Sequence, residues 1–435
     1  MGEESIVAKT SLIQAIRGMN DILPDEIPVW QYLESILQAL MRAYAYQEIR
    51  TPILEETALF KRSVGEITDI VEKEMYTFLD RNGDSLSLRP EGTASCMRAC
   101  LEHGLVYHQV QRLWYVGPMF RHERPQKGRY RQFYQFTAEC LGVAEPSIDV
   151  ELILLTSRLW KHLGLSSCLE FQLNSLGLLP ERENYKKVLV TYFSSRLSEL
   201  DEDSQRRLKT NPLRILDSKN PEMQSCIAGA PVLSDHLGEV SQAHFHQVKT
   251  LLDKAGVAYR VNPRLVRGLD YYSHTVFEWV TTQLGAQGTV CAGGRYDSLA
   301  QQLGGMEVPG VGFSMGLERI IALLISEGLY LASPQVDVYL LYQGGAAVEE
   351  ALLLAETIHN RLPELRLLRD GSGGKLTHQF KRADKSGAVL ALILGEQESR
   401  DKTITIKFLR QDKPQITLAQ DKLIYFLEEQ SWKIS

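Results

Sequence analysis

The chain has 435 residues, of which 44% are hydrophobic and 23% are charged, and its formal net charge is −6. This composition is typical of a globular protein with two or three domains, and it argues against a generic nucleic-acid coat protein. No apolar run approaches the ~20 residues of a membrane span, and residues 1–10 predict a loose tail rather than a signal peptide. The six cysteines show no metal-ligand spacing, so we expect reduced thiols in a cytoplasmic protein.

The first predicted element is a helix over residues 26–46, where apolar side chains recur at helical spacing. Asp25 is a plausible N-cap, and Pro28 suits the first turn. An extended piece over residues 48–53 follows, in which Pro52 suits an edge or a strand end. From this pattern alone, an ordinary core helix is the simplest interpretation.

Two short strands are predicted at residues 75–79 and 85–89, joined by a tight turn at Asn82-Gly83. The next residues, Glu91-Gly92-Thr93, lead into a helix. They can present a carboxylate, a backbone N–H and a hydroxyl to one small ligand. Alternatively, Thr93 can simply cap the helix, and the two roles are compatible.

Residues 111–140 are the most informative stretch, and they predict two strands joined by a basic loop. Side chains two apart in a strand share a face, so Gln135 and Glu139 point the same way. Burying such groups is costly unless they bind something, which favours a site over a plain hairpin. Arg121 and Glu123 close the first strand. The loop carries cations that suit phosphate or nucleic acid, or that form a solvated tip: Arg124, Lys127, Arg129 and Arg131.

Several later stretches carry weaker signals. Residues 146–165 predict a helix, and residues 178–255 predict polar, solvated helices. RLVRGLDYY at 264–272 is by itself most simply a strand end with packed tyrosines, and CAGGRYD at 291–297 predicts a glycine turn that permits close approach to a ligand. A glycine-spaced strand then leads into a helix near Glu318-Arg319. A cation at a helix start is unfavourable, which indicates either a bound anion such as an ATP phosphate or a lone surface arginine.

Ser333-Pro334 marks a boundary, beyond which strands and helices alternate. This alternation predicts a small α/β domain over residues 334–435. Its strands are expected at 336–341, 365–368, 388–394 and 404–409, and its helices at 346–361, at 376–385 and at the end of the chain. Gly371–Lys375 is not a P-loop, because the spacing to Lys375 is too short and Leu376 replaces the required Ser or Thr.

Taken in chain order, these strings resemble the class II aminoacyl-tRNA synthetases. FRHE with its loop and return strand, 111–140, resembles motif 2, while 26–53 resembles motif 1 and 310–327 resembles motif 3. QAIRGMNDILPDE at 14–26, LRPEGT, RGLDYY and AGGRYD resemble strings of the histidyl-tRNA synthetases in particular. The resemblance covers about residues 12–430. It implies an α+β fold with an antiparallel sheet core flanked by helices over 1–330, a helical insertion at 178–255, and a C-terminal α/β anticodon-binding domain over 334–435.

The resemblance implies a histidine–tRNA ligase. Such an enzyme activates L-histidine with ATP and Mg²⁺ to histidyl-adenylate and pyrophosphate, and then esterifies the 3′ end of histidine tRNA. It also implies a homodimer built through motif 1, without a membrane partner. The alternative is a catalytically silent regulatory subunit of ATP phosphoribosyltransferase, which tends to lose the catalytic strings and C-terminal domain present here. A tRNA-binding sensor module is disfavoured by the complete set of arginines.

The resemblance also implies roles for individual residues. Arg121 and Arg267 are the expected catalytic groups at the α-phosphate, with Arg267 doing work that a metal ion does in other class II enzymes. No dedicated protein cage for a metal is expected. The predicted ATP site comprises Arg121, Glu123 and Arg319. The predicted histidine site comprises Glu91, Gly92, Thr93, Arg121, Gln135, Glu139, Arg267, Tyr271 and Tyr272, with Glu139 and Tyr272 on the imidazole. The predicted tRNA acceptor contacts are Arg124, Gln126, Lys127 and Arg129.

Overall fold

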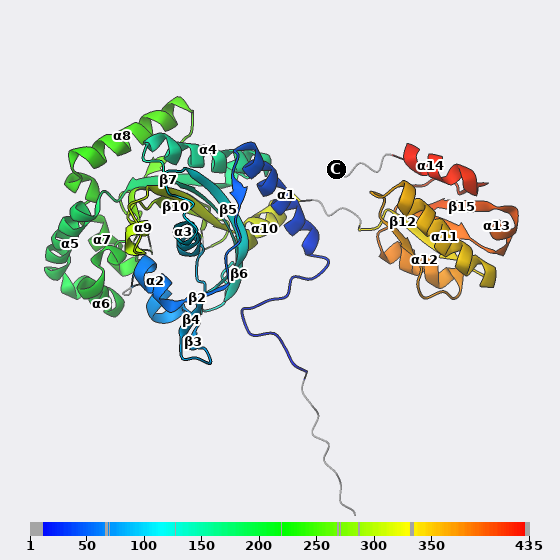
Figure 1. The fold of residues 1–435 in the computed structure, drawn as a ribbon, viewed down its shortest axis with the longest axis horizontal. Helices are drawn as coiled ribbons and strands as arrows, with labels where there is room; N and C mark the ends of the chain where they lie inside the picture. The colour runs from blue at the N-terminus through cyan, green and yellow to red at the C-terminus, as the bar shows by residue number, and fades with distance from the viewer. Residues whose placement is uncertain are drawn as a thin grey trace, which may run out of the picture. The chain divides into compact units, whose positions relative to one another are not determined.

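The computed structural model describes residues 12–65, 68, 70–126, 128–218, 220–267, 269, 271–285, 288–330 and 335–430. The chain divides into two compact units, of which the first ends at Tyr330 and the second begins at Leu331 (Figure 1). The tail predicted for residues 1–10 and the boundary at Ser333-Pro334 lie outside the described residues.

The first unit is built on an eight-stranded sheet with the order β1-β5-β6-β11-β10-β9-β7-β8. Its strands are β1 (Gln47–Glu48), β5 (Gln111–Phe120), β6 (Gln132–Leu141), β7 (Glu170–Ser175), β8 (Arg260–Val261), β9 (Ser273–Val280), β10 (Thr289–Arg295) and β11 (Gly310–Gly316). Neighbouring strands run antiparallel except for the outer pairs β1–β5 and β7–β8, which are parallel. The predicted antiparallel sheet core is therefore confirmed.

Strand alternation gives the large sheet one apolar face and one polar face. Phe136 and Phe313 lie on the apolar face, in a core formed with helices. These helices are α1 (Ile27–Ala43), α4 (Pro146–His162), α8 (Glu239–Lys254) and α10 (Leu317–Ser326). Helix α3 (Thr93–Glu102) lies within the curve of the sheet on its other side (Figure 1). Gln135 and Glu139, two of the predicted ligands, belong to this polar face.

Two predicted helix caps are wrong. The position before α1 is occupied by Glu26 rather than Asp25, and no side chain caps this helix. Thr93 does not cap α3; instead, the Glu91 carboxylate accepts hydrogen bonds from the backbone N–H groups of Thr93 and Ala94 at 2.7 and 2.9 Å. A carboxylate suits this position because the helix dipole favours negative charge at the first turn.

The extended piece predicted at residues 48–53 pairs with the sheet only at its start, in β1. Arg89 explains why the strand ends early. Its buried guanidinium donates to the carbonyl oxygens of Thr51 and Pro52 at 3.0 and 3.4 Å. These bonds satisfy backbone groups that a neighbouring strand would otherwise pair.

A small three-stranded sheet follows α1 in the chain. It has the order β2-β4-β3, with β2 (Leu54–Glu56), β3 (Thr77–Leu79) and β4 (Ser85–Leu88). The predicted hairpin between the last two strands is confirmed, with its turn at Asn82-Gly83. Helix α2 (Thr57–Val64) and a short π-helix (Ile70–Glu74) lie between β2 and β3 in sequence.

Helices occupy the predicted insertion at residues 178–255. They are α5 (Leu179–Ser194), α6 (Glu202–Thr210), α7 (Gln224–Ala228) and α8, with short 3-10 turns between them. Tyr185 and Leu189 of α5 share an apolar cluster with Tyr115 of the sheet. Helices α5 to α7 of the insertion therefore pack on the polar side of the core, whereas α8 packs on its apolar side, so the insertion is not only a solvated appendage.

The glycine turn predicted at residues 291–297 is wrong, because most of it forms β10. The glycines permit close packing within the sheet instead. A Cβ added to Gly293 would overlap the carbonyl oxygen of Gly312 on the neighbouring strand β11.

The second unit is the predicted α/β domain, with a five-stranded sheet in the order β13-β12-β14-β15-β16. Its elements are β12 (Val338–Tyr342), α11 (Gly345–Arg361), β13 (Leu367–Arg369), α12 (Leu376–Lys385), β14 (Leu390–Leu394), α13 (Glu396–Asp401), β15 (Thr403–Phe408), β16 (Ile416–Ala419) and α14 (Leu423–Glu429). Helix α13 and strand β16 were not predicted, because they are short and mostly exposed and so carry no clear apolar period.

Each of the six cysteines is a free thiol. Within the part of the chain that the structure describes, no helix has both the length and the apolar character needed to cross a membrane.

Candidate active site

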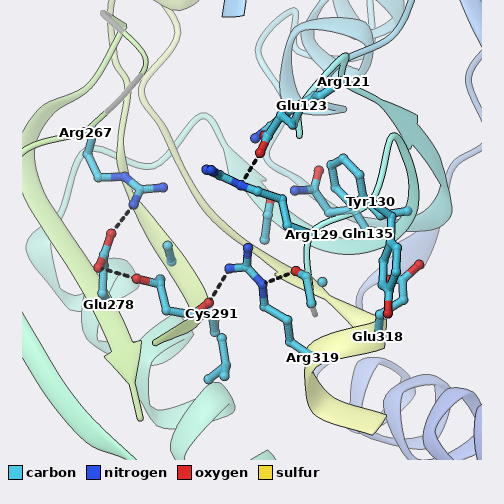
Figure 2. A pocket seen from close by; sticks show the side chains of 17 residues that line it. Arg121, Glu123, Arg129, Tyr130, Gln135, Arg267, Glu278, Cys291, Glu318 and Arg319 are labelled. Atoms are coloured by element: carbon cyan, nitrogen blue, oxygen red, sulfur yellow. Dashed lines mark hydrogen bonds and ion pairs between the residues drawn. The ribbon is translucent and has the colours of Figure 1, made fainter. Parts of the chain in front are cut away.

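A cavity of about 300 Å³ lies on the polar side of the large sheet (Figure 2). It brings together three arginines that are far apart in sequence. Arg121 directly follows β5, Arg267 lies in the irregular segment before β9, and Arg319 lies in the first turn of α10. These are the three guanidinium groups predicted to surround one nucleotide, and they do line one cavity. Their contacts with ATP stay a prediction.

Arg319 is held by backbone oxygens from two other segments. Its Nε donates to the carbonyl of Gly128 at 2.9 Å, and its Nη1 donates to the carbonyl of Thr289 at 2.6 Å. Burial, followed by the positive charges of Arg129 and Arg121, lowers the pKa of Arg319. Cations held this close together are stabilised by an anion between them, so the cavity suits phosphate.

Arg267 is fixed by a carboxylate that the sequence analysis did not single out. Its Nη1 donates to Oε1 of Glu278 at 2.5 Å, and Oε2 of Glu278 accepts from the Thr289 hydroxyl at 3.0 Å (Figure 2). The guanidinium also lies 5.2 Å from the ring centroid of Tyr272. Burial by itself would lower the pKa of Arg267. The interactions with Tyr272 and Glu278 are stronger than this effect, so the pKa of Arg267 is raised above its ordinary value. A lone glutamate within an apolar strand carries no sequence signal for this role.

Three polar atoms of cavity residues are buried without a hydrogen-bond partner among the described residues. One, Oε2 of Glu123, still has an ion pair with Arg129. The other two are Oε1 of Gln135, an acceptor, and Nε of Arg267, a donor. Buried polar atoms in folded proteins are nearly always paired, and an unpaired one is costly. Both atoms belong to predicted ligand-binding side chains, so a ligand in the cavity can satisfy them.

The basic loop after β5 divides into two parts. Arg129 turns back, forms an ion pair with Glu123 and lines the cavity (Figure 2). Arg124 and Gln126 are exposed on the loop. Lys127, the fourth predicted acceptor contact, lies outside the described residues. Arg129, one of the predicted tRNA contacts, therefore lines the same cavity as Arg121, Arg267 and Arg319.

Glu318 is a second cavity residue to which the sequence analysis gave no role. Its Oε1 accepts from the backbone N–H of Tyr134 at 2.8 Å, which joins the start of α10 to β6. Burial raises the pKa of Glu318 to about 7, although the hydrogen bond and Arg319 work in the opposite direction.

A buried cluster of hydroxyl groups surrounds Glu139, whose side chain is 1% exposed. Oε1 of Glu139 accepts from the Thr93 hydroxyl at 2.7 Å and from the Tyr115 hydroxyl at 3.2 Å. Oε2 accepts a short hydrogen bond from the hydroxyl of Tyr296. Burial raises the pKa of Glu139 to about 8, while the three hydroxyl donors lower it.

Glu139 and Tyr272 were both predicted to contact the imidazole, and those contacts stay predictions. Among the described residues, the phenols that donate to Glu139 are those of Tyr115 and Tyr296, and no hydrogen bond joins Glu139 to Tyr272. Tyr272 lies near two other tyrosines: its ring centroid is 4.8 Å from that of Tyr271 and 6.5 Å from that of Tyr296. Gly312 makes room for this arrangement, because a Cβ at that position would overlap Oε2 of Glu139. The only sequence signal for Tyr296 was its place within AGGRYD.

The predicted ammonium ligands at the start of α3 are already engaged. Glu91 caps that helix, and burial raises its pKa. Gly92 lies so close to Tyr115 that a Cβ would overlap the phenol ring. Arg121 joins this region to the cavity, since its Nε donates to the carbonyl of Pro90 at 2.8 Å. The unpaired oxygen of Gln135 is thus the acceptor most open to a new ammonium group.

A largely antiparallel sheet, three arginines from segments beside its strands around one cavity, and a separate α/β unit are the arrangement predicted for a class II aminoacyl-tRNA synthetase. A family model described as histidyl-tRNA synthetase matches residues 18–320, and a model described as an anticodon binding domain matches residues 335–430. The chain therefore belongs to the histidyl-tRNA synthetase family.

Solved structures agree with this assignment. The apo histidyl-tRNA synthetase of S. aureus is 35% identical to this chain, with a TM-score of 0.80. The match covers 96% of this chain and 100% of the S. aureus chain. The histidyl-tRNA synthetase of Nostoc sp. PCC 7120 shares the fold at 18% identity, 96% and 99% coverage and a TM-score of 0.68. An ATP phosphoribosyltransferase regulatory subunit/histidyl-tRNA synthetase from Bacillus halodurans also shares it, at 19% identity, 89% and 99% coverage and a TM-score of 0.62.

Proposed function

We propose that this protein is a histidine–tRNA ligase that acts on L-histidine, ATP and histidine tRNA in the cytoplasm. The observation that carries the proposal is the meeting of Arg121, Arg267 and Arg319 at one cavity, on the same face of the sheet as the buried carboxylate of Glu139. A protein that only bound tRNA would have no need for three arginines around one cavity in the sheet unit.

In the first step, a carboxylate oxygen of histidine attacks the α-phosphorus of ATP. The bond between the α-phosphorus and the bridging oxygen breaks, and pyrophosphate leaves. Arg121 and Arg267 stabilise the negative charge that develops on the α-phosphate, and Arg319 binds the γ-phosphate end. Such a transfer needs positioning and charge stabilisation more than covalent catalysis by the protein.

Mg²⁺ enters with ATP as part of the MgATP substrate. The cavity carboxylates each have a partner: Glu123 pairs with Arg129, Glu278 with Arg267, and Glu318 with a backbone N–H. No group of three or more His, Cys, Asp or Glu side chains among the described residues could hold a metal ion. Mg²⁺ commonly binds substrate phosphates with only one or two carboxylates, so this donor set fits the proposal.

Histidine specificity comes from the polar groups beside the cavity. Gln135, Glu91 and Thr93 bind the ammonium group of histidine, and the side-chain oxygen of Gln135 accepts its hydrogen bond. Glu139, with Tyr272 and Tyr296 around it, provides hydrogen-bond partners for the imidazole nitrogens. A site that hydrogen-bonds its substrate can reject apolar amino acids by about 10⁴ or more, because they leave its buried groups unpaired.

In the second step, the 3′-hydroxyl of the tRNA attacks the histidyl carbonyl carbon and AMP leaves. The exposed loop residues Arg124 and Gln126 contact the acceptor end, chiefly at phosphates. The second unit binds the anticodon, and the active form is a homodimer built through the region of α1.

Pyrophosphate exchange with each of the twenty amino acids tests the proposal. Radiolabelled pyrophosphate should enter ATP only with histidine present, and only histidine tRNA should then be charged. Binding of ATP phosphoribosyltransferase without any exchange would support the regulatory-subunit alternative. Exchange that prefers another amino acid would refute the histidine assignment.

A further inference from the structure

Arg267 lies in a segment without regular secondary structure. This segment, residues 262–272, is described except at 268 and 270, and it also carries Tyr271 and Tyr272. A side chain on irregular backbone is held in place only by the contacts of that backbone and its neighbours. The position of Arg267 at the cavity therefore depends on what anchors this segment, here called the Arg267 segment.

The first anchor is Arg264, which reaches into the helical insertion. Its Nη1 donates to the carbonyl of Pro231 at 3.0 Å, and its Nη2 donates to the carbonyls of Ala228 and Ala230 at 3.1 and 2.6 Å. Carbonyls at the end of a helix lack partners within it, and those after α7 are paired here by one guanidinium. The hydroxyl of Tyr185 on α5 joins the same group, donating to Pro231 at 2.7 Å.

The second anchor is a side chain of the insertion, Arg182, which contacts the C-terminal end of the segment. Arg182 of α5 is buried, and its Nη1 donates to the backbone carbonyl of Tyr272. Leu265, Tyr271 and Tyr272 also share one apolar cluster with Tyr185 of the insertion. The insertion thus binds both ends of the Arg267 segment.

The sheet supplies the remaining contacts. Nδ2 of Asn174 donates to the carbonyl of Leu265 at 3.0 Å, and the backbone N–H of Asn262 donates to Leu173 at 2.9 Å. The segment is therefore held between β7 and the insertion. The polar contacts between the segment and the insertion are made by Arg264 and Arg182, and neither side chain lines the 300 Å³ cavity.

We propose that Arg264 and Arg182 are positioning residues, through which the helical insertion holds Arg267 at the cavity. The inference rests on the proposed function, since it assigns the insertion a part in adenylate formation. That step needs no tRNA, so the insertion is a component of the active site even before tRNA binds.

A double-mutant cycle tests this coupling. Arg264→Ala should lower kcat for histidine-dependent pyrophosphate exchange by about 10- to 100-fold, because small misplacements of a catalytic group have effects of this size. The KM for ATP should change less than kcat. In an Arg267→Ala background, assayed at high enzyme concentration, the same change should cost less than about threefold, because residues that act together are not additive. Independent, multiplicative losses would overturn the proposal.

Arg260→Ala is the matched control. Arg260 lies just before the segment, and within the described part of the chain its side chain forms only an exposed ion pair with Glu170, the two side chains being 57% and 53% exposed. It should leave exchange unchanged within about twofold. Arg264→Lys, which keeps one donor for the same carbonyls, should give an intermediate loss and guards against a variant that fails to fold.

Hydrogen exchange separates this inference from the proposed function, because it needs no activity. In Arg264→Ala, backbone amides at 262–275 should exchange at least about tenfold faster, while those of β11 keep their protection. This result would support the anchor even if the protein activated no amino acid. Unchanged protection of the segment would overturn it.

Discussion

Glu139 is a carboxylate in a place where a charge is costly. Among the residues that the structure describes, its three hydrogen-bond donors are all hydroxyls, from Thr93, Tyr115 and Tyr296, and no cation pairs with it directly. Burial without a countercharge favours the protonated acid. This explains why the pKa of Glu139 is raised to about 8, and it means that the group can donate as well as accept near neutral pH.

The pH dependence of stability should report this proton. Because the pKa is about 8 in the folded protein and 4.5 for an unperturbed glutamate side chain, the folded state keeps a proton that the unfolded state releases between these values. As pH rises through this window, the native protein should lose stability relative to Glu139→Gln by up to about 1.4 kcal/mol per pH unit. Above about pH 8 the difference should level off.

Urea unfolding at pH 5 to 9 measures this effect. Glu307→Gln, a change at an exposed carboxyl, serves as the control. A difference between Glu139→Gln and the native protein that stays flat across the range would show that Glu139 is ionised in the fold.

Arg267→Ala should reduce histidine-dependent pyrophosphate exchange by about 100-fold or more, because it removes a preorganised charge at the α-phosphate. The far-ultraviolet circular dichroism should stay unchanged, since the segment contributes no helix or strand. Exchange near the native rate would exclude the proposed role. Arg260→Ala is again the appropriate comparison, because it removes an equal charge nearby.

At the scale of elements, Arg89 joins three parts of the fold. It follows β4, donates to Thr51 and Pro52 after β1, and donates through Nε to the carbonyl of Pro118 in β5 at 3.0 Å. Because Arg89 is buried and bonded to both segments, the position of the end of β4 depends on the chain after β1 and on β5. Sequence periodicity could not find it, because a single arginine has no period.

Arg89→Met should lower the free energy of unfolding of the first unit by about 3 kcal/mol, since it leaves buried carbonyls without donors. Urea unfolding followed by tryptophan fluorescence suits the measurement, because Trp30, Trp114, Trp160 and Trp279 all lie in this unit. Arg81→Ala, at an exposed position of the nearby hairpin, should change stability by less than about 0.5 kcal/mol. Equal losses of unfolding free energy in Arg89→Met and Arg81→Ala would contradict this role of Arg89.

For the whole molecule, the described residues form separate cores in the two units. One apolar cluster of the second unit is built from β12, β14, β15, α11 and α14, and it includes no residue of the first. Each unit therefore has the apolar burial that independent folding requires.

Deleting residues 334–435 should separate the two half-reactions. Pyrophosphate exchange should stay within about tenfold of the full chain, while charging of histidine tRNA should fall further, because only the second step uses contacts to the anticodon. Parallel measurement of both rates on the full and shortened chains decides this. A larger loss of exchange than of charging would reverse the proposed division of labour.

The sequence by itself determined the family, most of the helices and strands, and three arginines that the structure brings to one cavity. Apolar periods of two and 3.6 depend on local geometry, so most helices and strands were predictable, and the strings carrying Arg121, Arg267 and Arg319 pointed to one site. The short exposed elements α13 and β16 were missed because they have little apolar period to read.

Only the tertiary structure decided which groups actually meet. Strand register placed Gly312 opposite Glu139, and the fold brought the hydroxyl of Tyr296 to that carboxylate. It also paired Glu278 with Arg267, and packing of the insertion supplied Arg264 and Arg182 as anchors. Hydrogen bonds between residues far apart in sequence depend on where the folded backbone brings them, and neither composition nor spacing encodes that distance.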